Sequence, residues 1–216
     1  MQKKIAIYGA GGFGREVLML IRQINQFTSD QWDFVGFYDD GIETGTLVNG
    51  YPVLGGIADL NQLNQPIGIV IAIGNPTTKK KIVVGLQTAN VYYPILIHPS
   101  VSVNDDQQIK IGEGTIICTG TILTVNIRVG QHVILNLNCT VGHDTRIENY
   151  CSFMPAVNLS GEVLVEEGVY IGTGATVINQ VIIGQNTTVG AGAVIVKSLP
   201  ANCTAVGAPA KPIKFH

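Results

Sequence analysis

The chain has 216 residues, and its 13 basic and 15 acidic side chains give a formal net charge of −2. This balance, with Lys79-Lys80-Lys81 as the longest basic run, argues against a nucleic-acid partner. Only 13% of the residues are charged, and no run of about 18 apolar residues occurs, so no membrane span is predicted. Met1-Gln2-Lys3-Lys4 leads into a short strand rather than a signal peptide, which favours the cytoplasm.

The first elements predict a nucleotide-binding unit. Residues 4–8 have the pattern of a buried strand, residues 9–14 form a Gly-x-Gly-x-x-Gly turn, and residues 15–24 have the pattern of a helix. In that context the glycines permit a tight turn, and the helix N-terminus offers N–H groups to an anion. The same glycines could serve only to pack the helix on a sheet.

A second strand is expected at residues 33–38, and it ends in Asp39-Asp40. Nucleotide-binding α/β units place an acidic ribose or base contact at this position, although an acidic turn before Gly41 explains the pair equally well. A short edge segment at residues 51–56, strands at 67–73 and 92–97, and a helix at 77–88 complete a Rossmann-like βαβ domain over residues 1–97. This is about half of a dinucleotide fold, so it suits a nucleotide but not a nicotinamide cofactor.

From Ile111 to Pro200 the sequence repeats every six residues. Each of the fifteen hexads opens on an apolar residue, and the fifth position is small or β-branched almost throughout. A helix would need a period near 3.6 and an ordinary strand a period of 2, so a period of six predicts a parallel β-helix with the first and fifth side chains inside. We expect this all-β domain to span residues 98–204, with a loose first turn and then about five regular coils. A Pro/Gly-rich tail at 205–216 should not continue it.

The sixth positions of several hexads are predicted to face outward, yet they are aliphatic. An outward aliphatic stripe indicates a subunit interface. These residues are Ile116, Ile122, Ile134, Leu164, Ile182 and Val194.

His143 and Asp144 are the residues of the repeat best suited to chemistry. Both are expected at a corner, where neighbours can point outward together, and a carboxylate that fixes the tautomer makes histidine a general base near neutral pH. A solvated histidine is the simpler alternative.

His132 lies two hexads away on another face, and no third histidine of the repeat completes a zinc site. The cysteines are expected to face inward in a reducing compartment, which argues against an acyl-enzyme; they are Cys118, Cys139, Cys151 and Cys203.

The order of these motifs resembles that of the bacterial sugar acyltransferases of the NeuD/PglD group. That group joins a small nucleotide-binding domain to a left-handed β-helix, and the resemblance covers essentially the whole chain. The matching segments are Tyr8 to Gly14, Asp39-Asp40, Ala72 to Asn75, Gly142 to Asp144, Leu159 to Gly161 and Val206 to Ala210.

The resemblance implies direct acetyl transfer from acetyl-CoA to the amine of a nucleotide-linked amino sugar, by a homotrimer with active sites between adjacent subunits and without a metal. It implies His143 as general base, with Asp144 holding its imidazole. It assigns the nucleotide sugar to Gly11, Gly12, Phe13, Asp39, Asp40 and Gly74, and the coenzyme to Ser152, Gly161, Thr173 and Ala191. Some relatives carry histidine where Phe13 and Ser152 stand here.

Four other functions are compatible with parts of the sequence. An O-acetyltransferase acting on a free sugar such as sialic acid would use the same base. A β-helical zinc hydratase would need three convergent histidines, and a dinucleotide-dependent oxidoreductase would need a longer first domain. A non-catalytic binding protein would not need His143. The sequence does not identify the nucleotide, the sugar or the amine position; precursor synthesis for capsule, O-antigen or another glycan is the setting implied.

Overall fold

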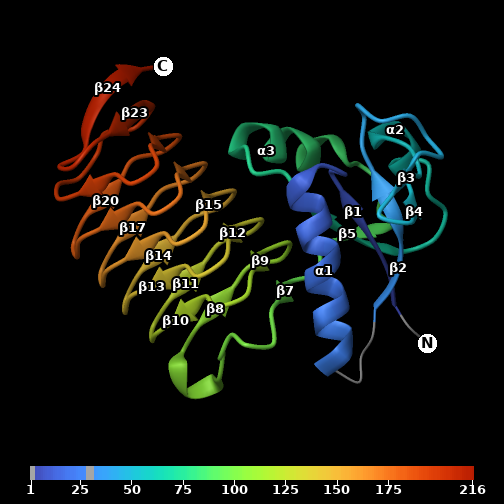
Figure 1. Ribbon diagram of the computed structural model, residues 1–216, viewed down its shortest axis with the longest axis horizontal. Coiled ribbons are helices and arrows are strands. Elements are labelled where there is room, and N and C mark those ends of the chain that lie inside the picture. Colours follow the sequence, from blue (N-terminus) through green and yellow to red (C-terminus); the bar gives the residue numbers. More distant parts are fainter. Residues whose placement is uncertain (1–2, 28–31) are drawn as a thin grey trace. The chain divides into compact units, whose positions relative to one another are not determined.

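The computed structural model describes residues 3–27 and 32–216 (Figure 1). The chain forms two compact units. The first comprises the chain up to Gly74 together with Thr78–Leu96, and the second comprises Asn75–Thr77 together with Ile97–His216. Within the described ranges, no helix is both long enough and apolar enough to cross a membrane.

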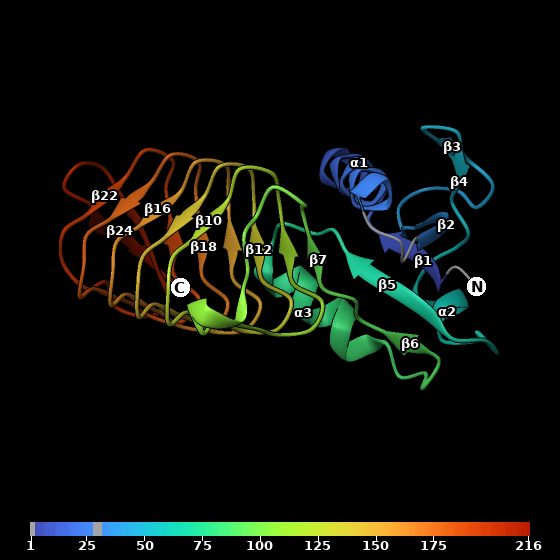
Figure 2. The ribbon, with the colours of Figure 1, turned by 90° about the horizontal axis from the view of Figure 1, so that it is seen from below.

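The first unit is built on a parallel sheet with the strand order β2-β1-β5-β6. Helix α1 lies on one face of this sheet (Figure 2). On the other face, Leu60 of α2 and Ile82 of α3 join one apolar cluster with Ala6 and Ile69 of the sheet. The elements are β1 (Lys3–Tyr8), α1 (Gly12–Phe27), β2 (Trp32–Tyr38), β3 (Leu47–Val48), β4 (Tyr51–Pro52), α2 (Ile57–Leu60), β5 (Ile67–Ile71), α3 (Pro76–Gly85) and β6 (Val91–Tyr92).

Amphipathic periodicity explains both layers of the first unit. Side chains of β1 and β5 alternate between the two faces, as expected for a strand covered on both sides. Helix α1 buries one stripe against the sheet, formed by Gly14, Val17, Leu18, Leu20, Ile21 and Ile24. The predicted Rossmann-like α/β unit is therefore confirmed.

The second unit is a left-handed parallel β-helix, as predicted. Its strands fall into three sheets, and from β8 to β22 each two-residue strand pairs with the one that lies three hexads further along where the sheet continues, as Ile122 does with Thr140 and Thr140 with Asn158. The first sheet contains β10 (Ile122–Leu123), β13 (Thr140–Val141), β16 (Asn158–Leu159), β19 (Thr176–Val177) and β22 (Val194–Ile195). The second contains β8 (Lys110–Ile111), β11 (Arg128–Val129), β14 (Arg146–Ile147), β17 (Leu164–Val165) and β20 (Ile182–Ile183). The third contains β7 (Leu96–Ile97), β9 (Ile116–Ile117), β12 (Ile134–Leu135), β15 (Ser152–Phe153), β18 (Tyr170–Ile171), β21 (Thr188–Val189), β23 (Cys203–Val206) and β24 (Lys211–Phe215).

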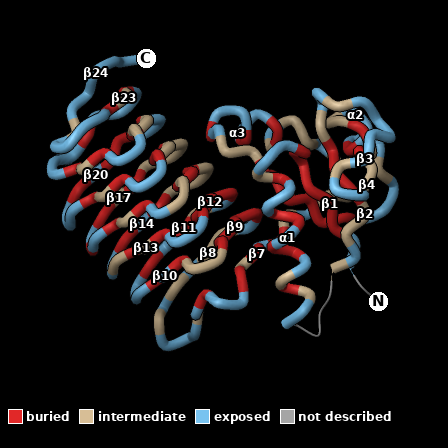
Figure 3. Tube along the Cα trace, in the orientation of Figure 1, coloured by how far each residue is buried: buried red, intermediate tan, exposed pale blue. Residues whose placement is uncertain are grey.

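The interior of the β-helix follows the hexad pattern. Every opening residue from Ile117 to Ile195 is buried, and so is every fifth residue from Thr115 to Leu199 (Figure 3). Buried threonines at the fifth position satisfy their hydroxyls on the neighbouring coil: Thr115 Oγ1, for example, donates to the Gly130 carbonyl at 2.8 Å. A hydroxyl is thus accepted inside because backbone carbonyls at the corners receive its hydrogen bond.

The ends of the β-helix differ from the sequence prediction. Residues 92–97 are not one strand, because β6 pairs with β5 of the first unit while β7 begins the third sheet of the β-helix. At the other end, β23 still pairs in parallel with β21, so the chain continues the coil through Val206. It then reverses, and β24 pairs with β23 in antiparallel orientation. About six turns result, in agreement with the predicted loose first turn and five regular coils.

The predicted outward stripe of aliphatic residues is only partly present. Ile122 and Ile182 are 58% and 45% exposed, but Ile116 and Ile134 are 0% and 1% exposed within this one chain. The hexad phase predicts which way a side chain points from its coil, but not how far that side chain is exposed.

Candidate active site

His143 and Asp144 lie at the solvent-exposed corner between β13 and β14. Asp144 has a φ of 58°, and this left-handed backbone lets two consecutive side chains meet at the turn. Nδ1 of His143 lies 2.8 Å from Oδ2 of Asp144. The two side chains are 56% and 51% exposed, so a substrate can reach them from solvent.

The Asp144 carboxylate has a second donor one coil earlier. Asn126 Nδ2 donates to Asp144 Oδ1 at 3.1 Å. The hydrogen bond from His143, followed by that from Asn126, lowers the pKa of Asp144 below its ordinary value of 3.8, so it is an anion at neutral pH. The anion accepts the Nδ1–H of His143, which leaves the Nε2 lone pair available to take a proton.

Gly161 of the following coil lies against the His143 imidazole. A Cβ at this position would lie 2.4 Å from Nε2 and 2.5 Å from Cε1 of His143. The two coils are also joined here by the N–H of Glu162, which donates to the His143 carbonyl at 2.7 Å. Gly161, assigned by resemblance to the coenzyme groove, therefore also makes room for the imidazole.

The other residues assigned to the coenzyme lie elsewhere on this chain. Ser152 is completely buried in β15, in the third sheet. Thr173 and Ala191 are exposed at successive turns of the corner that follows β18 and β21, and the Thr173 carbonyl accepts the N–H of Gly192 at 2.8 Å. One chain thus groups Thr173 with Ala191, and Gly161 with His143, but does not bring the two groups together.

The glycine turn of the first unit has the predicted geometry. Gly9 has a φ of 103°, and a Cβ on Gly14 would lie 1.9 Å from the Gly9 carbonyl oxygen, so the helix can approach the turn only with glycine there. Nothing lies within 4 Å of the Cβ position of Gly11, and α1 begins at Gly12. Phe13 is half-buried. The turn is therefore open, next to the N-terminus of a 16-residue helix.

The carboxylates of Asp39 and Asp40 accept hydrogen bonds from the turns that follow the carboxyl ends of the strands. Asp39 accepts the N–H groups of Ala10 and Gly41, each at 2.9 Å. Asp40 accepts the Tyr8 hydroxyl and, at 2.9 Å, the N–H of Ile57. Burial, followed by the hydrogen bond to Asp40, raises the pKa of Tyr8. The acidic pair therefore has a structural role, whatever it contributes to a ligand.

The six residues assigned to the nucleotide sugar do share one edge of the sheet. Gly11, Gly12 and Phe13 follow β1, Asp39-Asp40 follow β2, and Gly74 lies just beyond β5. These three strands are parallel neighbours, so their carboxyl ends meet, and this is where open α/β sheets bind ligands.

Neither His132 nor the cysteines form part of this site. His132 is only 2% exposed, and its ring stacks on Tyr150 with centroids 5.6 Å apart. All four cysteines are buried, and burial raises the pKa of the Cys139 thiol to about 11. Among the described residues, no group of three or more His, Cys, Asp or Glu side chains is placed to hold a metal ion.

Sequence reasoning missed several polar residues around the two candidate sites. Asn126 supports Asp144 from a position three hexads earlier, a spacing that could have indicated the contact, whereas Tyr8 contacts Asp40 from another strand and no local motif indicates it. Three cations, Lys110, Arg128 and Arg146, lie in register on adjacent strands of the second sheet. Their spacing of three hexads is a signal in the sequence that could have revealed this column.

Comparison with known proteins is consistent with both units. Residues 4–86 match the family model of the PglD N-terminal domain, and residues 162–197 match that of the bacterial transferase hexapeptide (six repeats). The chain is 32% identical over 215 residues to the GDP-perosamine N-acetyltransferase of Escherichia coli O157:H7, covering 96% of this chain and 95% of that protein.

Solved structures resemble the chain over nearly its whole length. The acetyltransferase domain of PglB from Neisseria gonorrhoeae, in complex with acetyl coenzyme A, has a TM-score of 0.88 at 32% identity and covers 99% of this chain and 100% of its own. Perosamine N-acetyltransferase from Caulobacter crescentus, in complex with CoA and GDP-perosamine, was crystallised as a mutant with one histidine replaced by asparagine. It has a TM-score of 0.87 at 29% identity and covers 98% of this chain and 97% of its own.

These matches extend over the glycine turn, the sheet edge and the His143 corner rather than over the repeats alone. The chain belongs to the family of hexapeptide-repeat sugar N-acetyltransferases that carry a PglD-type N-terminal domain.

Proposed function

We propose that this protein transfers the acetyl group of acetyl-CoA to the amine of a nucleotide-linked amino sugar, with His143 as general base. The observation that carries the proposal is the exposed His143–Asp144 contact of 2.8 Å, which engages Nδ1 and leaves Nε2 free of that contact at a corner of the β-helix. The relatives act on or bind GDP-perosamine, so a GDP-linked 4-amino sugar is the first acceptor to test.

The reaction is a direct transfer in a ternary complex. Nε2 of His143 takes the proton of the amine as its nitrogen attacks the thioester carbonyl, and a C–N bond forms. The tetrahedral intermediate collapses, the C–S bond breaks, and the imidazolium returns the proton to the departing sulfur. Asp144 stabilises the imidazolium throughout, and general base catalysis of this kind contributes roughly 10²–10⁴-fold. Backbone N–H groups of the neighbouring rod would stabilise the oxyanion.

A homotrimer would complete the site. Thr173 and Ala191 are exposed but do not lie at the His143 corner of their own chain, so a donor groove between adjacent rods would combine His143 of one subunit with these residues of the next; Ser152, which is completely buried, would not line that groove. Closed threefold symmetry would repeat this junction three times. Aliphatic Ile122 and Ile182, both exposed in the single chain, are candidates for the contact between rods.

The first unit would bind the nucleotide. The open turn at Gly11 and Gly12, next to the N-terminus of α1, offers N–H donors and a positive dipole end to an anionic ligand. Residues 1–97 would then select the acceptor, while the β-helix binds acetyl-CoA and catalyses the transfer. We place the reaction in the cytoplasm, where buried thiols such as those of this chain stay reduced.

A thiol-release assay tests the proposal. Purified protein is supplied with acetyl-CoA and a panel of acceptors: GDP-perosamine, UDP- and dTDP-linked 3- and 4-amino-6-deoxy sugars, and free sialic acid. Turnover of a nucleotide amino sugar, with the acetyl group on nitrogen in the product, is the expected result. Turnover of sialic acid alone would move the reaction to oxygen, and no turnover with any acceptor would reject the acceptor class.

A further inference from the structure

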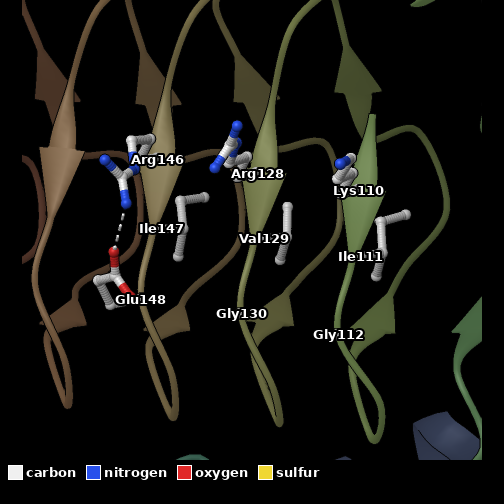
Figure 4. Close-up of a pocket in the computed structure, with 9 residues that line it drawn as sticks. All are labelled: Lys110, Ile111, Gly112, Arg128, Val129, Gly130, Arg146, Ile147 and Glu148. Carbon is white, nitrogen blue, oxygen red and sulfur yellow. Dashed lines mark ion pairs between the residues drawn. The ribbon is translucent and has the colours of Figure 1, made fainter. Parts of the chain in front are cut away.

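The Asp144 carboxylate shares its surroundings with three cations. It lines a groove of about 480 Å³ together with Gln108, Lys110, Asn126, Arg128 and Arg146. Figure 4 shows Lys110, Arg128 and Arg146 side by side on β8, β11 and β14, and the register pairs Arg128 directly with each of the other two. Guanidinium groups are strong partners for carboxylates. Asp144 is the one anion among the six residues of this groove, so an arginine competes with His143 for it.

The two arginines differ in how far they are engaged elsewhere. Arg146 Nη2 lies 3.6 Å from Glu148 Oε1, as the dashed line in Figure 4 marks. Arg128 has no ion pair within the part of the chain that the structure describes. The side chain of Asp144 is half exposed, so it has room to change rotamer. Unless its second oxygen is held, the carboxylate can therefore turn from His143 toward Arg128.

Asn126 holds that second oxygen. Its Nδ2 donates to Asp144 Oδ1 at 3.1 Å, while His143 Nδ1 lies 2.8 Å from Asp144 Oδ2. Two donors on different oxygens fix the plane of the carboxylate as well as its position. The amide is neutral, so it holds Asp144 without cancelling the negative charge that stabilises the imidazolium.

The backbone places the two side chains for this contact. Asn126 and Asp144 occupy equivalent corners of successive coils, with φ of 57° and 58°. The Asn126 N–H donates to the Gln107 carbonyl at 2.8 Å, and the Asp144 N–H donates to the Val125 carbonyl at 3.1 Å. Asparagine adopts this left-handed conformation more readily than most residues. The amide thus reaches the carboxylate from a fixed backbone, one coil away.

We propose that Asn126 is a positioning residue that keeps Asp144 on His143 rather than on Arg128. The inference rests on the proposed function, because it takes His143 as the general base. Without the amide, the carboxylate would pair with Arg128 and the Nδ1–H of His143 would lose its acceptor. The proton could then occupy Nε2, the atom on which the base needs a lone pair.

The tautomer of His143 is measured first. Long-range ¹H–¹⁵N correlation spectra are recorded on the full-length protein with ¹⁵N-labelled histidine at pH 8, where an ordinary imidazole is neutral. His143→Asn identifies the signal of His143 among the four histidines. The test variant is Asn126→Gly, because glycine accepts a φ of 57° without strain. We expect the Nδ1–H form in the wild type and a mixture of both tautomers in Asn126→Gly.

Asn186→Gly is the matched control. Asn186 has a φ of 56°, is exposed at a corner outside both candidate sites, and its Nδ2 donates to Asn202 Oδ1 at 3.1 Å. This variant loses the same kind of hydrogen bond between successive coils, from the same backbone conformation. It should keep the tautomer and the kcat of the wild type.

Steady-state kinetics with acetyl-CoA and the accepted sugar then tests catalysis. Loss of one neutral hydrogen bond should lower the kcat of Asn126→Gly roughly 3- to 10-fold, with the KM of both substrates unchanged. Removal of the competing cation should reverse the effect. The double variant Asn126→Gly/Arg128→Gln should regain most of the lost kcat and the Nδ1–H tautomer, and Arg128→Gln alone should match the wild type. A merely structural role of Asn126 would not be rescued by removal of an arginine.

A wild-type tautomer or a wild-type kcat in Asn126→Gly would overturn the proposal. It would also be overturned by an equal change in Asn186→Gly, or by a double variant that regains neither property. If the wild type acetylates no acceptor, the proposed function fails, yet the tautomer spectra still decide the role of Asn126. A tautomer change in Asn126→Gly that Arg128→Gln reverses would then show that Asn126 positions Asp144.

Discussion

The α-carbon of Gly161 lies against the imidazole ring of His143 in the preceding coil, and a Cβ on this residue would approach Nε2 to 2.4 Å. The residue at the corner of one coil thus limits the space for the side chain at the equivalent corner of the preceding coil. Because the φ of Gly161 is not in the left-handed region, steric contact with the ring is the reason to expect glycine here.

Gly161→Ala should therefore displace the imidazole and separate Nδ1 from Asp144. We expect kcat to fall at least tenfold while the Tm changes little, because an exposed ring can move aside. Steady-state kinetics and thermal unfolding measure the two effects. Ser160→Ala, at the exposed preceding residue, is the matched control and should retain activity. Full activity of Gly161→Ala would show that the observed ring position is not needed for catalysis.

His143→Asn should remove the general base while keeping a side chain that can contact Asp144. The expected loss is roughly 10²–10⁴-fold in kcat, with KM values changed much less, since His143 acts mainly in the transition state. Thermal unfolding should show an intact fold, because the side chain is more than half exposed. Activity equal to that of the wild type would exclude His143 as the base.

Asp144→Asn tests the positioning role of the carboxylate. Loss of a hydrogen bond to an imidazolium should cost roughly 10- to 100-fold in kcat, less than loss of His143 itself.

The pKa of Asp144 is lowered in the folded protein, so the stability that its ionised form contributes is present above the unfolded pKa of 3.8. That stability is lost as the pH falls through the lower pKa of the folded state. Between about pH 5 and 9 the wild-type carboxylate stays ionised, so it should not be the source of an acid limb in kcat/KM. An acid limb that disappears in Asp144→Asn would contradict this assignment.

Gly14→Ala should destabilise the first unit. The added Cβ would lie 1.9 Å from the Gly9 carbonyl oxygen, and backbone cannot move aside as a side chain can. We expect a loss of about 1–3 kcal/mol or more in stability, together with weaker nucleotide binding. Gly12→Ala, where the nearest atom is Arg15 Nη2 at 4.0 Å, is the stability control. Chemical denaturation compares the variants, and equal stabilities would show that the turn can relax.

The cysteines should be unreactive in the folded protein. All four are buried, and the Cys139 thiol, with a pKa of about 11, is protonated at pH 8. Iodoacetamide at pH 8 should label none of them under native conditions and all four in urea, as counted by mass spectrometry. Rapid native labelling of one cysteine that also abolishes acetyl transfer would revive an acyl-enzyme mechanism.

The interior of the β-helix could be predicted residue by residue because its spacing is fixed. Each coil repeats the same backbone, so the first and fifth positions of every hexad point inward. The burial of Leu123 and Thr145 therefore follows from their places in the repeat alone. The contact between His143 and Asp144 could be predicted for the same reason, since it depends only on a local corner.

Some features that the sequence did not reveal depend on partners outside the repeat. Tyr8 reaches Asp40 from a different strand, whereas Asn126 lies one coil before Asp144, at a spacing that the repeat does contain. The low exposures of Ile116 and Ile134 do not follow from their outward position in the hexad. The C-terminal hairpin was not predicted because the Pro and Gly residues that indicate the end of a coil lie after β23 rather than before it.

The constant length of three hexads per coil also fixes distances along the rod. Each coil advances the chain by one strand spacing of about 4.8 Å, and Thr173 and Ala191 lie 30 and 48 residues after His143, at a different corner, so their separation from His143 along the rod is a fixed number of hexads. Loss or duplication of one whole coil between them would preserve every corner while changing that separation by one step. The number of coils between two corners of the β-helix therefore sets the distance between the side chains that those corners carry.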